Sequence, residues 1–158
     1  MTSANPQVAR EIYRKIAANI AGVDLQGRSF NPDEMRGKVT LLFFWSLAGG
    51  QYSLISLPAV QQAADYLQNK DVLVLGINGD ADKAEVIRQL MERKQCKFRT
   101  VLDAEQKLRH AYQIGGEPTF IVVGRDGKVA WARLGAPPTL RQDLITEVEK
   151  ALSSRASK

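Results

Sequence analysis

Apolar runs of strand length alternate with helical stripes along this chain, and that alternation restricts the folds it can adopt. Residues 38–45 are mostly β-branched and aromatic, which predicts a strand buried on both faces. Residues 72–77 predict a second buried strand. Between them, residues 52–69 carry apolar side chains at helical spacing, with Pro58 inside the helix. This strand–helix–strand order predicts a parallel sheet with helices packed on it.

The same alternation continues in the middle of the chain. Asp80 or Asp82 is predicted to cap a helix that ends at Lys94. Residues 97–102 form the next predicted strand, and Asp103 is predicted to cap a short helix after it.

The last third of the sequence predicts antiparallel strands. Residues 119–123 and 128–133 form two predicted strands joined by the turn signal RDG at residues 125–127. Thr139 opens a capping-box pattern that begins a final helix ending near Ser153. The whole order predicts an α/β fold, a three-layer α/β/α sandwich whose central mixed sheet is flanked by helices.

The first residues predict an addition to this core. Asn5 is predicted to cap a helix whose apolar stripe reaches Ile20 and which ends at Gly22. Residues 24–30 predict a short strand pair around Gly27. The predicted organisation is a helical extension at residues 1–22, one domain at 23–153 and a frayed tail at 154–158.

Composition and charge narrow the classes of function. The 158 residues are 44% hydrophobic and 25% charged, which predicts a globular chain rather than a disordered one. The net charge of +5 is dispersed, and the densest basic run, at residues 88–99, alternates with apolar residues, so we expect no nucleic-acid partner. No apolar run approaches the roughly 20 residues of a membrane span. No signal peptide is visible, and the compartment stays open.

Two residues that occur only once carry little chemistry by themselves. Cys96 is the only cysteine, so no intrachain disulfide can form, and we expect a structural thiol where a helix gives way to a strand. His110 is the only histidine, and no cysteine or carboxylate cluster stands at ligand spacing from it. We therefore expect no metal and no cofactor.

Three motifs carry a family resemblance. They are GKVTLLFFW at residues 37–45, a Leu-Pro pair at 57–58, and GGEPTFIVV at 115–123 followed by an Asp-Gly turn. Taken in this order, residues 23–152 resemble the thioredoxin superfamily and, within it, the TlpA-type and redoxin (AhpC/TSA-like) thiol–disulfide oxidoreductases. The resemblance implies a thioredoxin-like sandwich and a cis peptide bond before Pro118.

The resemblance fails where the family carries its Cys-x-x-Cys motif. The stretch SLAGGQYS that follows Trp45 holds no cysteine. Counting forward from Trp45 puts Gly49 and Tyr52 in the cysteine positions, whereas counting back from the Leu-Pro pair puts Gly50 and Ser53 there. Disulfide exchange needs a thiolate and a second thiol that resolves the mixed disulfide, and none of these residues supplies either. We therefore expect dithiol–disulfide activity to be absent.

A binding groove is also implied by the resemblance. In the family, the backbone next to the cis-proline pairs with an extended substrate peptide. The corresponding predicted lining here is Trp45, Gly49, Gly50, Gln51, Tyr52, Ser53, Glu117, Pro118 and Thr119. The Gly-Gly pair before a helix also leaves open an anion site made by backbone N–H groups.

Three functions stay open at this point. The first is a redox-inactive thioredoxin-like module that binds an extended peptide or a partner protein in the predicted groove. The second is an oxidoreductase or antioxidant-type enzyme that uses Cys96 or a partner's thiol. The third is a structural domain of a larger assembly, attached through its first helix. The sequence names neither the partner nor the oligomeric state.

Overall fold

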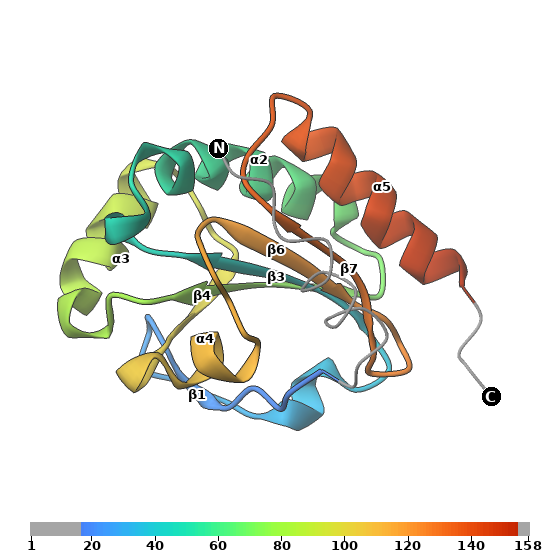
Figure 1. Cartoon of the computed structure of the whole chain (residues 1–158), viewed down its shortest axis with the longest axis horizontal. Helices are drawn as coiled ribbons and strands as arrows, with labels where there is room; N and C mark the ends of the chain where they lie inside the picture. The colour runs from blue at the N-terminus through green and yellow to red at the C-terminus, as the bar shows by residue number, and fades with distance from the viewer. Residues whose placement is uncertain (1–16, 155–158) are drawn as a thin grey trace.

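Seven strands form one mixed sheet in the computed structural model, which describes residues 17–154 (Figure 1). Their spatial order is β2-β1-β5-β4-β3-β6-β7. β3 (Val39–Trp45) runs parallel to β4 (Val72–Asn78) and antiparallel to β6 (Thr119–Val123). The other strands are β1 (Gly22–Asp24), β2 (Ser29–Phe30), β5 (Arg99–Leu102) and β7 (Val129–Leu134).

Helices cover both faces of this sheet (Figure 1). One face packs against α2 (Gln51–Leu67), α3 (Ala84–Arg93) and α5 (Leu140–Ser153). The other face packs against the short α4 (Lys107–Ala111). The β3–α2–β4 and β4–α3–β5 crossovers step across the sheet in the same direction, so right-handed connections put both helices on the same face. The α/β/α fold class predicted from the sequence is confirmed.

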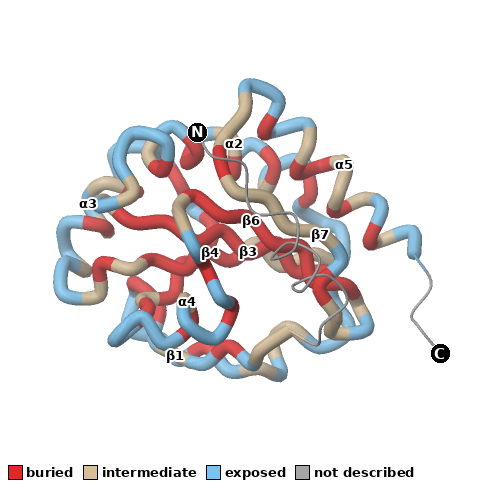
Figure 2. Tube along the Cα trace, viewed as in Figure 1, coloured by how far each residue is buried: buried red, intermediate tan, exposed pale blue. Residues whose placement is uncertain are grey.

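Every residue of β3 is buried, because both faces of the strand are covered (Figure 2). Alternate side chains enter the two halves of the core. On the α2 face, the ring of Phe43 stacks on Trp45 at a centroid distance of 5.9 Å and on Phe120 at 5.1 Å. An apolar stack thus supports β3 up to the residue where the loop to α2 begins.

The predicted cap of the short helix is present. The carboxylate of Asp103 accepts the backbone N–H of Leu108 at 2.8 Å and of Arg109 at 3.0 Å, so it caps the first turn of α4. The strand pair around Gly27 and the Asp-Gly hairpin between β6 and β7 also form as predicted.

Two other predicted caps were wrong. The predicted cap was Asp80 or Asp82. Asp80 precedes the 3-10 turn η3 (Ala81–Lys83), but its side chain makes no capping hydrogen bond there, and α3 begins after Lys83 with no side-chain cap, so Asp82 does not cap it either. The hydroxyl of Thr139 donates to the carboxylate of Asp143 at 2.7 Å instead of capping α5. Sequence spacing identified both helix starts, but the side chain of Asp80 accepts the N–H of Leu47 and that of Thr139 donates to Asp143.

The N-terminal helix was predicted to continue to Gly22, and that part of the prediction was wrong. Its start at Asn5 and most of its stripe lie outside the described residues, as do residues 155–158 of the predicted tail. Residues 17–21 are not helical. Ala17 donates its N–H to the carbonyl of Gly127 at 2.8 Å, and Ile20 is fully buried in the core on the α4 face. This segment is therefore held by the domain rather than by its own helical hydrogen bonds.

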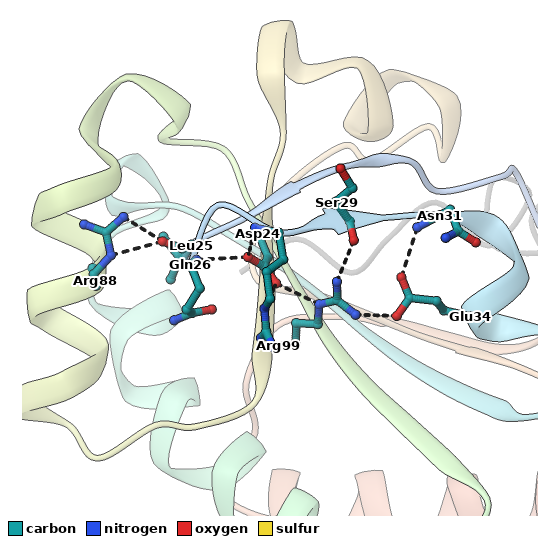
Figure 3. Close-up of polar contacts among 9 residues, drawn as sticks. Asp24, Leu25, Gln26, Ser29, Asn31, Glu34, Arg88 and Arg99 are labelled. Carbon is teal, nitrogen blue, oxygen red and sulfur yellow. Dashed lines mark hydrogen bonds and ion pairs between the residues drawn. The ribbon is translucent and has the colours of Figure 1, made fainter.

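An arginine-centred network joins the edge strands to the sheet (Figure 3). Arg99 on β5 donates to Asp24 at 2.9 Å, to Glu34 and to the carbonyl of Ser29 at 2.9 Å. The side chain of Asp24 is fully buried and also accepts two backbone N–H groups from the turn after β1. Burial raises the pKa of Asp24, but these hydrogen bonds outweigh burial and hold it below its ordinary value of 3.8.

Candidate functional site

The candidate site begins where β3 ends. Ser46 follows the strand and accepts the N–H of Gly49 at 3.1 Å, which caps the single turn η2 (Leu47–Gly49). Gly50 has φ of 74° and is the N-cap of α2. A backbone in this region favours glycine, so the chain needs glycine there to turn from η2 into α2.

Glu117 approaches this loop from the segment just before β6. The peptide bond between Glu117 and Pro118 is cis. The hydroxyl of Ser46 donates a short hydrogen bond to the carboxylate of Glu117, although 71 residues separate them in sequence. The carbonyl of Pro118 accepts the N–H of Gly135 at 2.9 Å, so the proline loop is held on its far side by the chain after β7.

Gly49 lies in crowded space beside this hydrogen bond. A Cβ atom at Gly49 would stand 2.5 Å from Ser53 Oγ and 3.1 Å from the Cβ of Glu117. Both separations are too short for ordinary contacts, so the space that a side chain at this position would take is already filled. Gly49 and Ser53, which come from the two ways of counting the lost cysteines, therefore lie side by side.

A second carboxylate holds the loop from the neighbouring strand. Asp80 accepts the N–H of Leu47 at 2.9 Å and the side-chain amide of Asn78 at 3.1 Å. The residue that looked like a helix cap thus belongs to the site. The signal in the sequence was its place just after β4, because parallel strands end at the same edge of a sheet and bring their C-terminal loops together.

The predicted groove residues differ sharply in exposure. Trp45 and Ser53 are fully buried, and Pro118 and Thr119 are also buried, so these four support the site from inside. Thr119 donates its hydroxyl to the carbonyl of Gly116 at 2.6 Å. The residues of the predicted lining that reach the surface are Gly49, Gly50, Gln51, Tyr52 and Glu117.

Two buried polar atoms of the site have no hydrogen-bond partner within residues 17–154. They are the indole N–H of Trp45 and the hydroxyl of Ser53. Buried polar groups are nearly always paired, because an unpaired one loses its hydrogen bonds to water and gains none in return. The polar groups of the site are therefore not completed by the described part of the chain.

Cys96 lies away from this site. β5, which follows it, pairs Leu102 with Asn78 at the site edge of the sheet, so Cys96 precedes the opposite end of that strand. Its thiol is buried near the carbonyls of Leu57 and Lys94, each at 3.7 Å. Burial raises its pKa to about 11. The predicted single thiol is therefore neither at the site nor activated.

The hollow next to Cys96 has a volume of about 790 Å³. Its charged lining is mixed, with basic residues beside the acidic Asp65 and Glu92: Arg28, Arg88, Lys97 and Arg99. Arg88 and Arg99 are already occupied by carbonyls and carboxylates of the chain, which leaves little charge to attract an anion.

Among the residues that the structure describes, no three His, Cys, Asp or Glu side chains gather as a metal site would require, and His110 is exposed on α4. The same part of the chain contains no helix long and apolar enough to cross a bilayer.

Comparison with known sequences identifies related proteins. The model of the AhpC/TSA family matches residues 13–132. The thiol-disulfide oxidoreductase ResA of Bacillus cereus is 25% identical over 122 residues, which cover 77% of this chain and 69% of the relative. ResA of Geobacillus thermodenitrificans is 28% identical over 106 residues, or 67% of this chain and 60% of the relative.

Solved structures give the same picture of the fold. The thioredoxin domain of a thiol-disulfide oxidoreductase from Bacteroides vulgatus superposes with a TM-score of 0.76 at 26% identity, covering 89% of this chain and 98% of that one. A thioredoxin-family thiol:disulfide interchange protein from Chlorobium tepidum TLS gives a TM-score of 0.78 at 18% identity, covering 89% and 97%. The architecture is therefore thioredoxin-like.

Proposed function

Because this chain belongs to the AhpC/TSA family of the thioredoxin superfamily and has no Cys-x-x-Cys motif, we propose that it is a redox-inactive member that binds an extended peptide or a partner protein beside Pro118. The observation that carries the proposal is the state of the loop between β3 and α2. This loop and the segment around Pro118 are packed together. At the positions where the family carries its two cysteines, this chain has glycine and residues with hydroxyl groups.

Unpaired backbone groups support a peptide ligand. Within residues 17–154, no hydrogen bond of the structure uses the N–H or the C=O of Glu117. An extended peptide can take both groups in the way that a strand adds to a sheet edge. Pro118, the next residue, cannot offer a free N–H and a free C=O, because proline has no N–H and the carbonyl of Pro118 accepts the N–H of Gly135.

Exposed apolar side chains lie on the helix that begins at this site. Tyr52 is 57% exposed and Ile55 is 56% exposed, both in the first two turns of α2. Large side chains that stand free of the core, and tyrosine in particular, are characteristic of surfaces where proteins bind. We therefore expect Tyr52 to contact a ligand that binds along Glu117 and Pro118.

The enzyme alternative uses either Cys96 or a partner's thiol, and the surroundings of Cys96 disfavour the first of these. A thiol with a pKa of about 11 has about two to three orders of magnitude less thiolate at neutral pH than an ordinary cysteine. We expect iodoacetamide to label native Cys96 at least about a hundredfold more slowly than the unfolded chain at the same pH. Labelling at equal rates would restore the enzyme hypothesis.

The redox part of the proposal is tested by insulin-disulfide reduction with dithiothreitol as the electron donor. An active thioredoxin is the positive control. We expect the chain to give the rate of dithiothreitol alone, because it holds no pair of thiols that can close into a disulfide. Reduction of insulin disulfides above that rate contradicts the proposal.

The binding part is tested with a phage library of random nine-residue peptides selected on the full chain. Amide chemical shifts then map the selected peptides. We expect shifts at residues 49–53 and at Glu117, and weaker binding by Tyr52→Ala. Tyr66→Ala is the matched control, because Tyr66 lies on the same helix and is 52% exposed, but at its far end. Equal losses in the two variants, or no selected peptide, contradict the proposed site.

A further inference from the structure

We propose that the peptide bound at this site carries a lysine or arginine side chain that pairs with Glu117. This inference rests on the proposed function and adds the chemical class of the ligand. Its basis is a carboxylate that no cation of the described chain neutralises, placed beside backbone groups that are free to bind an extended peptide.

The carboxylate of Glu117 is only partly used. One oxygen accepts the hydroxyl of Ser46. The other oxygen makes no hydrogen bond within residues 17–154, and none of the ion pairs formed there uses Glu117 or Asp80. In a chain with net charge +5, two unpaired carboxylates on adjacent loops give the site a charge opposite to that of the whole protein.

The hydroxyl of Ser53 is the second, independent sign of an incomplete site. Ser53 is fully buried, its Oγ has no partner in the described part of the chain, and it adjoins the carboxylate of Glu117 across Gly49. An ammonium group brings three donors and a guanidinium group brings five, and neither accepts a hydrogen bond. A basic side chain therefore supplies the donor that the free oxygen of Glu117, Oε2, lacks, while the oxygen nearer to Gly49 and Ser53 is Oε1, which Ser46 already uses.

The space at Gly49, one of the two candidate cysteine positions, is linked by packing to the acidic residue. The place of a side chain at position 49 is taken up by Ser53 Oγ and by Glu117, whose Oε1 would stand 3.3 Å from a Cβ there. Glycine at this position lets the carboxylate approach the tip of α2. Gly49, one of the two positions that the sequence offers for the first cysteine, thus makes room for a negative charge.

The backbone groups of Glu117 fix where the basic residue falls. A peptide that pairs with Glu117 as an added strand places one of its residues directly opposite, within about 5 Å between Cβ atoms. Opposite charges at such a position attract and like charges repel, so the charge selects among peptides of equal backbone fit. We therefore expect lysine or arginine at one defined place in the bound sequence.

The test uses the peptides selected on the full chain. One selected peptide is synthesised with its basic residue intact, with norleucine at that place and with glutamate there, and each is titrated against the wild-type chain and Glu117→Gln. We expect norleucine to weaken wild-type binding about fivefold and glutamate to weaken it further. Against Glu117→Gln, which keeps the size of the side chain and an acceptor for Ser46, we expect the three peptides to differ by less than about twofold.

Two controls separate a local charge from other effects. Glu92→Gln removes an exposed carboxylate of α3 that forms no ion pair within residues 17–154, and we expect it to keep the wild-type preference. Raising the salt concentration should weaken the basic peptide on the wild-type chain and leave it almost unchanged on Glu117→Gln.

Failure of this inference differs from failure of the proposed function. Selected peptides that bind equally well with lysine, norleucine or glutamate overturn the charge requirement and leave peptide binding intact. A selection that yields no peptide at all overturns both. Equal preferences in the wild-type chain and Glu117→Gln assign the charge effect to another residue and also overturn the inference.

Discussion

The Arg99 network and the Ser46–Glu117 cluster are both partly buried polar groups, but one is complete and the other is not. In the first, the carboxylate of Asp24 is fully buried and both its oxygens accept hydrogen bonds (Figure 3). In the second, one oxygen of Glu117 and the hydroxyl of Ser53 are without partners among residues 17–154. The polar groups of the Arg99 network are therefore used to hold the fold. The free oxygen of Glu117 can still accept a hydrogen bond from a ligand.

The two clusters also differ in what they connect. Arg99 joins β5 to Asp24 and Glu34, which belong to the short elements at one edge of the sheet. Those elements are too small to stay in place by apolar packing alone, so a saturated ion-pair network fixes them. Ser46 and Glu117 instead join two loops at the end of the central strands, where the strands themselves already provide support.

The largest effect is expected for Asp24→Asn. The substitution leaves Arg99 without its buried partner, and breaking such a pair costs about 3 kcal/mol of the free energy of unfolding. Urea denaturation measures it. Asp33→Asn is the control, because the ion pair of Asp33 with Arg36 is mostly exposed and should contribute little. If the two variants lose the same stability, the network does not hold the edge as described.

Acid should act through the same network. The pKa of Asp24 lies below 3.8 in the folded chain, so its contribution is present above that value and is lost as the pH falls through the folded pKa. We expect the melting temperature of the wild-type chain to fall steeply below about pH 4. The melting temperature of Asp24→Asn should be lower than that of the wild-type chain at pH 7 and should fall less as the pH is lowered. Parallel curves for the two proteins would falsify this assignment.

Gly49→Ala should have a smaller effect, which tests the crowding at the site. The added Cβ meets Ser53 Oγ and Glu117, and we expect a loss of about 1–2 kcal/mol in the free energy of unfolding. In a Ser53→Ala background the loss should shrink, because the atom at 2.5 Å is gone. Gly79→Ala is the matched control, since its nearest contact is 3.5 Å. If the changes in the free energy of unfolding for Gly49→Ala and Ser53→Ala are additive in the double variant, the crowding of Gly49 against Ser53 is not as described.

The smallest effects distinguish the two serines of the site. Ser46→Ala removes a hydrogen bond to Glu117 and one from Gly49, and should cost about 1 kcal/mol. Ser53→Ala removes a buried hydroxyl that has no partner within the described residues, so stability should stay the same or rise slightly. Thermal denaturation of both variants gives the comparison. A larger loss for Ser53→Ala would mean that its hydroxyl is satisfied in the free protein.

Local patterns predicted most of the framework. The strands β3, β4, β5, β6 and β7 and the helices α2, α3, α4 and α5 each match a predicted segment to within a few residues. The missing thiols could be read from the stretch after Trp45 without coordinates. The predicted continuation of the first helix to Gly22 failed because Ile20 is buried against the domain, and burial outweighed helical spacing.

The partners of polar side chains could not be predicted in the same way. Asp80 was one of the two aspartates predicted to cap the helix that ends at Lys94, yet its carboxylate accepts the N–H of Leu47 from another loop. Glu117 and Ser46 are 71 residues apart, and nothing in their local sequence couples them. A hydrogen bond forms with whichever group the fold brings within about 3 Å, and sequence spacing carries no information on that distance.

By itself, the sequence determined the order of strands and helices and the absence of a Cys-x-x-Cys motif, because hydrophobic periodicity and residue identity are local properties. Only the tertiary structure decided that Ser53 lies inside, that Cys96 is remote, and that Glu117 occupies the place beside Gly49. The reason is physical: burial and polar pairing arise when segments distant in sequence meet at one edge of the sheet.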